Sequence, residues 1–185
     1  MSTGIKIDYD LLSQKRLEYG PFTELVAAAN PKIILEVGFL YGEGLNVWSQ
    51  IASEQVFGID MMGHSPQVAT FNPGAIAIQG NSHKKEVQDQ LKSLLDGRTI
   101  DVLFIDGDHS YEGVKRDFVD YSPLVSDDGL VAFHDILDTP DHRRMKCRVD
   151  QFWSEIKKEY EHTELIAGTP KWGGIGVLHF GGRKL

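Results

Sequence analysis

Two acidic residues and a histidine follow a short apolar segment near the middle of the sequence. Residues 102–105 (VLFI) predict a buried strand, and Asp106, Asp108 and His109 come directly after it. Carboxylate and imidazole groups can bind a metal ion or exchange a proton with a substrate. We therefore expect either a ligand-binding site or a solvated turn at the end of this strand.

A second polar pair ends the next predicted strand. Segment 129–135 (GLVAFHD) finishes with His134 and Asp135. The carboxyl ends of neighbouring parallel strands share one crevice of a sheet, so Asp106, His134 and Asp135 are expected to converge. Acids that share a buried site favour a bound cation, and this ligand set suits Mg²⁺ or Mn²⁺. The alternative is that one acid pairs with Lys or Arg and that His134 is a hydrogen-bonded core residue.

A glycine-rich turn follows the first predicted strand. Glu36 is the last charged residue of segment 32–37 (KIILEV), and Gly38, Gly42 and Gly44 open the connection to the next helix. Glycine lets the backbone approach a ligand closely and adopt a positive φ. The spacing is not the G-x-G-x-x-G of dinucleotide-binding proteins, and Glu36 would repel a pyrophosphate. A ligand with an ammonium group fits better, and a tight turn without a ligand is the alternative.

Two further strand ends carry polar residues. Asp60 ends segment 55–60 (QVFGID), where an acid in such folds accepts hydrogen bonds from a ribose diol. A turn aspartate is the alternative role for Asp60. Asn81 and Ser82 follow segment 75–79 (AIAIQ), and either side chain can cap the next helix or hydrogen-bond an adenine edge.

The elements that position these residues alternate along the chain. Apolar residues recur on one helical stripe in 83–95, 110–124 and 149–160. Strand–helix alternation predicts a parallel sheet with helices on both faces. Segments 162–168 and 174–180 are too close together for a crossover helix, so they are expected to form an antiparallel hairpin. The predicted fold class is therefore α/β, with five parallel strands and a C-terminal antiparallel hairpin.

The composition limits the class of protein. The 185 residues are expected to form a single domain, with 1–31 as an N-terminal helical extension and 32–180 as the core. A net charge of −8 argues against nucleic acid as a partner. No segment has the roughly 18 apolar residues of a membrane span, and no signal peptide is evident. The single cysteine, Cys147, fits a reducing compartment, so a cytoplasmic location is expected.

The motifs together resemble one enzyme family, the class I S-adenosylmethionine-dependent methyltransferases. More narrowly, they are similar to the small-molecule O-methyltransferases that include macrolide sugar O-methyltransferases and cephalosporin-hydroxylase-like proteins. The resemblance rests on ILEVGFLYGEG (34–44), GID (58–60), GNS (80–82), FIDGDHSYEGVKRDF (104–118) and GLVAFHDI (129–136). It implies a Rossmann-like, seven-stranded methyltransferase sheet across residues 32–180.

The resemblance also implies S-adenosylmethionine as the cofactor. The implied contacts are Glu36, Gly38, Tyr41 and Gly42 at the methionine moiety, Asp60 at the ribose, Met61, Asn81 and Ser82 at the adenine, and Asp106 beside the cofactor. In metal-dependent relatives, the aspartate after strand four and an acid–amide pair after strand five bind Mg²⁺. Asp106 matches the first of these, whereas His134 and Asp135 match the pair only in part.

The expected reaction is O-methylation of a small hydroxylated molecule, such as a sugar or natural-product intermediate. Methyl transfer requires in-line alignment, and a general base or a metal ion must help to remove the hydroxyl proton. We expect His109 to be the base, with Asp106 and the metal assisting, or else to be a residue that only begins the next helix. Segments 61–74 and 136–148 are expected to select the acceptor. The basic cluster of the second segment is expected either to receive a phosphate or carboxylate of the substrate or to be a solvated helix face; it consists of His142, Arg143, Arg144, Lys146 and Arg148.

Two alternatives keep the same fold. One is an NAD-dependent enzyme, and the other is a non-catalytic module that binds a nucleoside. In either case no membrane partner is expected. The short segment before residue 32 offers little material for a lid, so the acceptor site is expected to be open or to be completed by a second subunit in a homo-oligomer.

Overall fold

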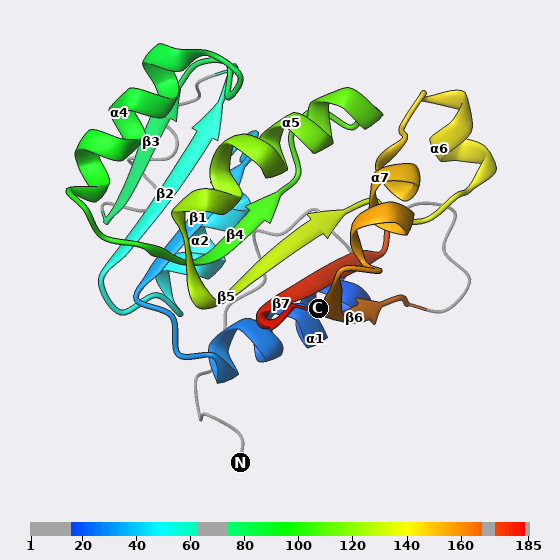
Figure 1. Ribbon diagram of the computed structural model, residues 1–185, viewed down its shortest axis with the longest axis horizontal. Helices are drawn as coiled ribbons and strands as arrows, with labels where there is room; N and C mark the ends of the chain where they lie inside the picture. The colour runs from blue at the N-terminus through cyan, green and yellow to red at the C-terminus, as the bar shows by residue number, and fades with distance from the viewer. Residues whose placement is uncertain (1–15, 63–73, 168–172, 184–185) are drawn as a thin grey trace.

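The structure, a computed structural model, describes residues 16–62, 74–167 and 173–183 (Figure 1). Its strands are β1 (Ile33–Val37), β2 (Gln55–Asp60), β3 (Ala75–Gln79), β4 (Ile100–Ile105), β5 (Val125–His134), β6 (Tyr160–Leu165) and β7 (Ile175–Arg183). Its helices are α1 (Arg16–Ala28), α2 (Glu43–Ser49), α4 (Lys85–Leu95), α5 (Tyr111–Tyr121), the 3₁₀-helix η1 (Ser122–Leu124), α6 (Pro140–Arg144) and α7 (Val149–Ile156).

The seven strands form one sheet in the order β3-β2-β1-β4-β5-β7-β6. The first five strands pair in parallel, and β7 pairs antiparallel with both β5 and β6. The predicted fold class is therefore confirmed: a Rossmann-like methyltransferase sheet that ends in antiparallel strands. The chain places β2 and β3 on one side of β1 and then returns to place β4 on its other side, so the strand order reverses between β1 and β4. Ligands of open α/β sheets bind at such a switch point.

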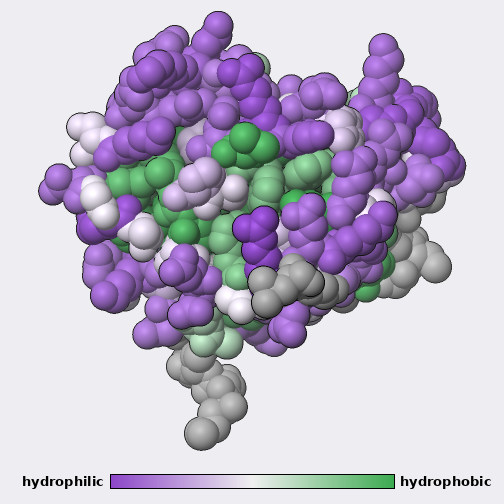
Figure 2. Space-filling model, in the orientation of Figure 1, coloured by the Kyte–Doolittle hydropathy of each residue, from purple (hydrophilic) through white to green (hydrophobic). Residues whose placement is uncertain are grey.

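Helices cover both faces of the sheet, which explains why the central strands are apolar throughout. On one face, α4, α5 and α7 pack against residues such as Leu103 and Phe133, and on the other face α1 and α2 pack against residues such as Phe104. All five residues of β1 are buried, including Glu36. Figure 2 shows hydrophobic side chains gathered in the middle of the visible face, with hydrophilic side chains around them.

Several elements begin or end at other residues than predicted, and strand β5 is the one that bears on the site. Strand β5 begins at Val125, four residues before the predicted start, and ends at His134. Asp135 therefore lies just beyond the strand, where its φ of 61° turns the chain out of the sheet.

Within the part of the chain that the structure describes, no helix is long and apolar enough to cross a membrane.

Candidate active site

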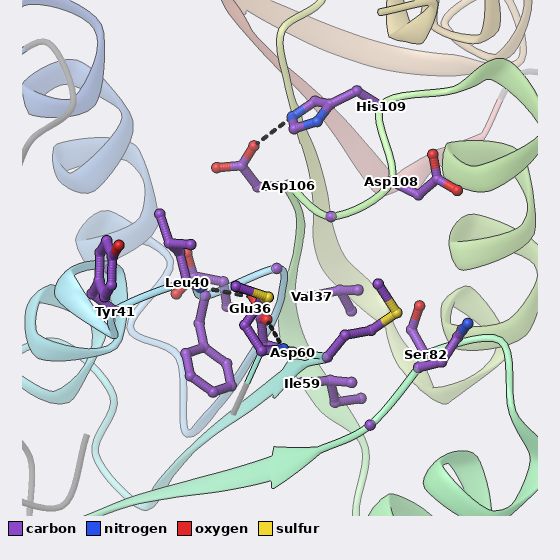
Figure 3. A pocket seen from close by; sticks show the side chains of 18 of the residues that line it. Glu36, Val37, Leu40, Tyr41, Ile59, Asp60, Ser82, Asp106, Asp108 and His109 are labelled. Carbon is purple, nitrogen blue, oxygen red and sulfur yellow. Dashed lines mark hydrogen bonds and ion pairs between the residues drawn. The ribbon is translucent and has the colours of Figure 1, made fainter. Parts of the chain in front are cut away.

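A pocket of about 480 Å³ lies at the carboxyl ends of β1, β2 and β4 (Figure 3). This volume is within the range of small-molecule and cofactor sites, roughly 300–1,000 Å³. Eight of the nine residues that were predicted to contact a cofactor line this pocket: Glu36, Gly38, Tyr41, Asp60, Met61, Asn81, Ser82 and Asp106. Gly42 itself forms the turn behind this lining, as the N-cap of α2. His109 lines the same pocket.

The glycine turn brings the ends of β1 and β4 together. Gly38 has a φ of +91°, and a Cβ atom at this position would lie 2.2 Å from the backbone oxygen of Asp106. Its N–H donates a hydrogen bond to the Ile59 carbonyl oxygen of β2 at 2.8 Å. Only glycine allows both this backbone conformation and this close approach. The turn therefore fixes how close the first strand lies to Asp106.

Glu36 is a buried carboxyl group at the floor of the pocket. The indole Nε1 of Trp48 donates a hydrogen bond to its Oε2 at 3.1 Å. Burial, followed by the nearby charge of Asp106, raises the pKa of Glu36 well above its ordinary value. A cationic group in the pocket would favour the ionised carboxylate, because it would offset the energy of holding a negative charge away from water.

Asp60 organises the rim of the pocket at the end of β2. Its carboxylate accepts backbone N–H hydrogen bonds from Leu40 at 2.8 Å and Met62 at 2.7 Å. This is the geometry of a turn aspartate, the alternative role for this residue. It leaves further lone pairs on both oxygens, so a ligand hydroxyl can still donate to Asp60. Tyr41 and Met61 lie at the rim with about half or more of their surface exposed, 49% and 65%.

Asn81 and Ser82 line the pocket but do not cap the next helix. The N-cap position of α4 is Lys84, which makes no side-chain capping hydrogen bond, so the capping role was wrong. Asn81 instead accepts a hydrogen bond from the His83 N–H at 2.8 Å. Ser82 donates its hydroxyl to the buried Asp117 of α5 at 2.6 Å. These contacts tie the loop after β3 to α5.

A cluster of acids and histidines lies where β4 and β5 end, as their pairing requires. The Nδ1 of His134 lies 3.2 Å from Oδ1 of Asp106 and 3.4 Å from Oδ1 of Asp135. The Nε2 of His109 lies 3.2 Å from the carboxylates of both Asp106 and Asp135. Figure 3 shows His109 and Asp106 facing each other at the pocket. The solvated-turn alternative therefore applies only to Asp108, which is exposed and accepts the Ser110 N–H.

The charges in this cluster support one another. Burial alone would raise the pKa of Asp106, but His134 and His109 outweigh burial and hold it well below its ordinary range. Burial would lower the pKa of His109 and of His134, but the neighbouring carboxylates raise both above the ordinary histidine value. Asp106 is therefore ionised, and the positive charge that it requires comes from histidine protons or from a bound cation.

Four of these residues could also hold a metal ion. One ligand atom from each of Asp106, His109, His134 and Asp135 lies within 4.8 Å of the other three. Metal–ligand bonds of about 2.0–2.2 Å place neighbouring ligand atoms roughly 3 Å apart, close to the contacts observed here. The three predicted metal ligands thus lie together, and His109 joins them from the loop before α5.

Two buried residues at this cluster were not singled out correctly from the sequence. Glu18 of α1 lies 3.4 Å from Nε2 of His134 and also accepts the Gly174 N–H at 2.9 Å. His142, which was expected to bind substrate or to lie on a solvated helix face, is buried, and its Nε2 lies 3.3 Å from Oδ1 of Asp135. Nothing in the sequence around Glu18 indicated its contact with His134. No spacing in the sequence indicated the contact between His142 and Asp135, because Asp135 follows β5 and α6 begins only at Pro140.

The two segments expected to select the acceptor have different outcomes. Residues 63–73, most of segment 61–74, lie outside the described residues. In segment 136–148, Arg143 pairs with Asp138 at 2.7 Å and Arg144 pairs with Asp141 at 3.1 Å. These local ion pairs offset much of the positive charge that was expected to receive an anionic substrate.

Comparisons with known proteins agree with this geometry. A family model described as a methyltransferase domain matches residues 35–136. The protein y4gI of Sinorhizobium fredii, described as uncharacterized, is 26% identical over 189 residues and aligns with 89% of this chain. The chain spans only 19% of the length of that relative.

Solved structures show the same fold at low sequence identity. An O-methyltransferase from Bacillus cereus in complex with SAH (S-adenosylhomocysteine) has a TM-score of 0.66 at 16% identity, over 91% of this chain and 83% of that chain. MycE, from the mycinamycin biosynthetic pathway and in complex with Mg, SAH and mycinamycin VI, has a TM-score of 0.60 at 17% identity, over 89% of this chain and 49% of that chain.

Proposed function

Because this chain belongs to the methyltransferase-domain family, we propose that it transfers a methyl group from S-adenosylmethionine to the hydroxyl of a small molecule, with a divalent metal ion assisting. The observation that carries the proposal is a single pocket that contains both the Glu36–Asp60 end and the Asp106–His109 end. In this proposal residues 32–180 form the catalytic core, and α1 is an extension that supplies Glu18 to it.

The Glu36–Asp60 end fits an amino acid joined to a nucleoside. Glu36 is buried with a raised pKa, so a ligand ammonium group would stabilise its ionised form. Asp60 is fixed by two backbone N–H groups and keeps lone pairs for a ribose diol. The backbone at Gly38 closes this end against Asp106, and Asn81 and Ser82 line the far side of the same pocket. Bound S-adenosylmethionine would supply an electrophilic methyl group on a sulfonium.

The cluster at β4 and β5 fits a hard divalent cation. Two carboxylates and a histidine face one another, and Oδ1 of the buried Asp135 has no hydrogen-bond partner among the described residues. Asp106, His134 and Asp135 would hold Mg²⁺ or Mn²⁺, which would lower the proton affinity of a coordinated hydroxyl. Glu18 would orient His134 by accepting its Nε2–H, which turns Nδ1 towards the two acids.

His109 is placed to take the proton from the acceptor. Its side chain is 38% exposed at the pocket, whereas His134 is almost fully buried. When S-adenosylmethionine supplies the methyl group, the proton that the acceptor hydroxyl loses would move to Nε2 of His109. Asp106 and Asp135 would stabilise the imidazolium that results, because both carboxylates lie 3.2 Å from Nε2.

Calorimetry tests the proposal in two steps. The folded protein should bind SAH, and Glu36→Gln should weaken this binding about tenfold or more, because a charge-assisted hydrogen bond to the ammonium is lost. Glu24→Gln, in α1 and away from the pocket lining, is the matched control. Mn²⁺ titration of wild type and of Asp106→Asn then tests the metal. Absence of SAH binding by folded protein, or tighter binding of NAD than of SAH, would overturn the proposal.

A further inference from the structure

A second group of potential metal ligands lies behind the pocket. Asp135, His142 and Cys147 each offer one ligand atom, and these atoms all lie within 4.8 Å of one another. All three residues are buried, with exposed fractions of 1%, 1% and 2%. None of them lines the pocket, and His142 and Cys147 fall outside residues 35–136 of the family match. The proposed methyl transfer uses neither His142 nor Cys147.

The hydrogen bonds of His142 fix the form of its imidazole ring. Nδ1 contacts the Leu137 carbonyl oxygen, which can only accept, so Nδ1 carries the hydrogen. The lone pair of Nε2 accepts the Gly173 N–H at 3.3 Å, and a cation bound at this nitrogen would replace that hydrogen bond. A neutral imidazole whose N–H is held by a backbone carbonyl is the arrangement that metal-bound histidines require.

That lone pair lies beside a carboxylate oxygen. Nε2 of His142 is 3.3 Å from Oδ1 of Asp135, and this oxygen has no hydrogen-bond partner among the described residues. A buried carboxylate oxygen this close to an imidazole nitrogen requires a positive charge between them, which either a proton or a metal cation supplies. The Sγ of Cys147 lies 3.9 Å from the backbone carbonyl oxygen of Asp135 and within 4.8 Å of the other two ligand atoms.

We propose that Asp135, His142 and Cys147 form a second metal site, which takes a thiolate-binding divalent cation such as Zn²⁺. One carboxylate, one imidazole and one thiolate are all ligands that Zn²⁺ uses, whereas Mg²⁺ and Mn²⁺ favour oxygen ligands over thiolate. Zn²⁺ bonds of about 2.0–2.3 Å place tetrahedral ligands roughly 3.3–3.6 Å apart, which matches the Asp135–His142 separation. On binding, the Cys147 thiol releases its proton to the solvent, and the sulfur–metal bond replaces the sulfur–hydrogen bond.

The two metal sites share Asp135. Its Oδ2 faces His109 of the first cluster, and its Oδ1 lies between His134 of the first cluster, at 3.4 Å, and His142 of the second, at 3.3 Å. A cation at the second site would join the end of β5 to α6 and to Cys147, which lies just before α7. The cation would therefore fix Asp135 in its strained, positive-φ conformation, in which Oδ2 faces His109 of the first cluster.

Cobalt substitution tests the second site without any need for cofactor binding. Chelator-treated protein is titrated with Co²⁺ in the presence of excess Mg²⁺, and the thiolate-to-cobalt charge-transfer band is recorded. We expect the band in wild type and in His109→Ala, which removes a residue of the first cluster but no ligand of the second site. Cys147→Ser should abolish the band, and His142→Gln should weaken Co²⁺ binding at least tenfold. Zn²⁺ should remove the band by displacing Co²⁺.

Two results would overturn this inference. One is a wild-type protein without a thiolate band, and the other is a His142→Gln variant that binds Co²⁺ as tightly as wild type. Circular dichroism checks that each variant folds. Should His142→Gln fail to fold, X-ray absorption of the zinc-loaded wild type decides, because the site requires one sulfur at about 2.3 Å together with nitrogen or oxygen at about 2.0 Å. A shell of oxygen and nitrogen alone would refute it. Because none of these readouts involves SAH, failure here is separable from failure of the proposed function.

Discussion

Gly38→Ala should destabilise the protein and weaken cofactor binding together, because Gly38 sets the separation of β1 and β4. The new methyl group would lie 2.2 Å from the Asp106 carbonyl oxygen and 2.5 Å from the Gly107 Cα. Both contacts are with backbone, so no side chain can rotate to relieve them. The strand ends must move apart, and Asp106 moves with them.

The magnitude has two parts. An alanine at a φ of +91° costs about 1–2 kcal/mol of folding free energy, the usual cost of left-handed backbone for a residue with a Cβ. Crowding against rigid neighbours adds about 1–3 kcal/mol. The unfolding free energy should therefore fall by about 2–5 kcal/mol. A displacement of Asp106 by a fraction of an ångström should also weaken SAH binding on the order of tenfold.

Gly97→Ala is the matched control for this experiment. Gly97 also has a positive φ, +78°, but nothing lies within 4 Å of the position of its Cβ. It therefore carries only the backbone cost, about 1–2 kcal/mol, and leaves the pocket unchanged. Urea unfolding gives both free energies, and calorimetry gives both affinities for SAH. Equal destabilisation of the two variants, with SAH affinity retained in Gly38→Ala, would refute the steric argument.

Three further predictions concern buried titratable groups. Burial raises the pKa of Asp117 from 3.8 to about 6, so folding takes up a proton between pH 4 and pH 6. The unfolding free energy should therefore fall by about 3 kcal/mol as the pH rises through this window. Asp117→Asn should remove this fall, as urea unfolding from pH 4 to 7 would show; a variant that retains it contradicts the assignment. Glu18→Gln should weaken Mn²⁺ binding about 10–100-fold in calorimetry without changing SAH affinity, and equal Mn²⁺ affinity would argue against orientation of His134. Burial raises the pKa of the Cys147 thiol from 9.0 to about 11, so in metal-free protein at pH 8 a disulfide reagent should react about 100-fold more slowly than with urea-unfolded protein. Similar rates in the two states would show that Cys147 is not buried in solution.

The fold could be predicted because its signals are local. Segments such as 102–105 are apolar without alternation, since a parallel strand is covered on both faces, and the short gap after 162–168 forces an antiparallel pairing. The ends of β1, β2 and β4 then share one edge of the sheet, which brings Glu36, Asp60 and Asp106 to the same pocket. Those residues could be identified because they directly follow, or end, a strand.

The remaining residues of the cluster depend on tertiary contacts that the sequence does not encode in any spacing. Glu18 meets His134 although 116 residues separate them, because α1 packs beneath the second face of the sheet. His142 is adjacent to two arginines in sequence, yet the short helix α6 turns His142 inward and the arginines outward. Capping by Asn81 or Ser82, one of the two roles that the sequence allowed, does not occur because the chain makes a further turn before α4 begins.

The position of β7 has a consequence for how the chain matures on the ribosome. This strand is the last of the seven to be synthesised, yet it inserts between β5 and β6. Until residues 175–183 leave the exit tunnel, β5 presents an unpaired edge and β6 has no neighbour to pair with. The sheet is therefore completed only after translation has passed β7, and nascent chains halted before that point should require chaperones that shield an open edge.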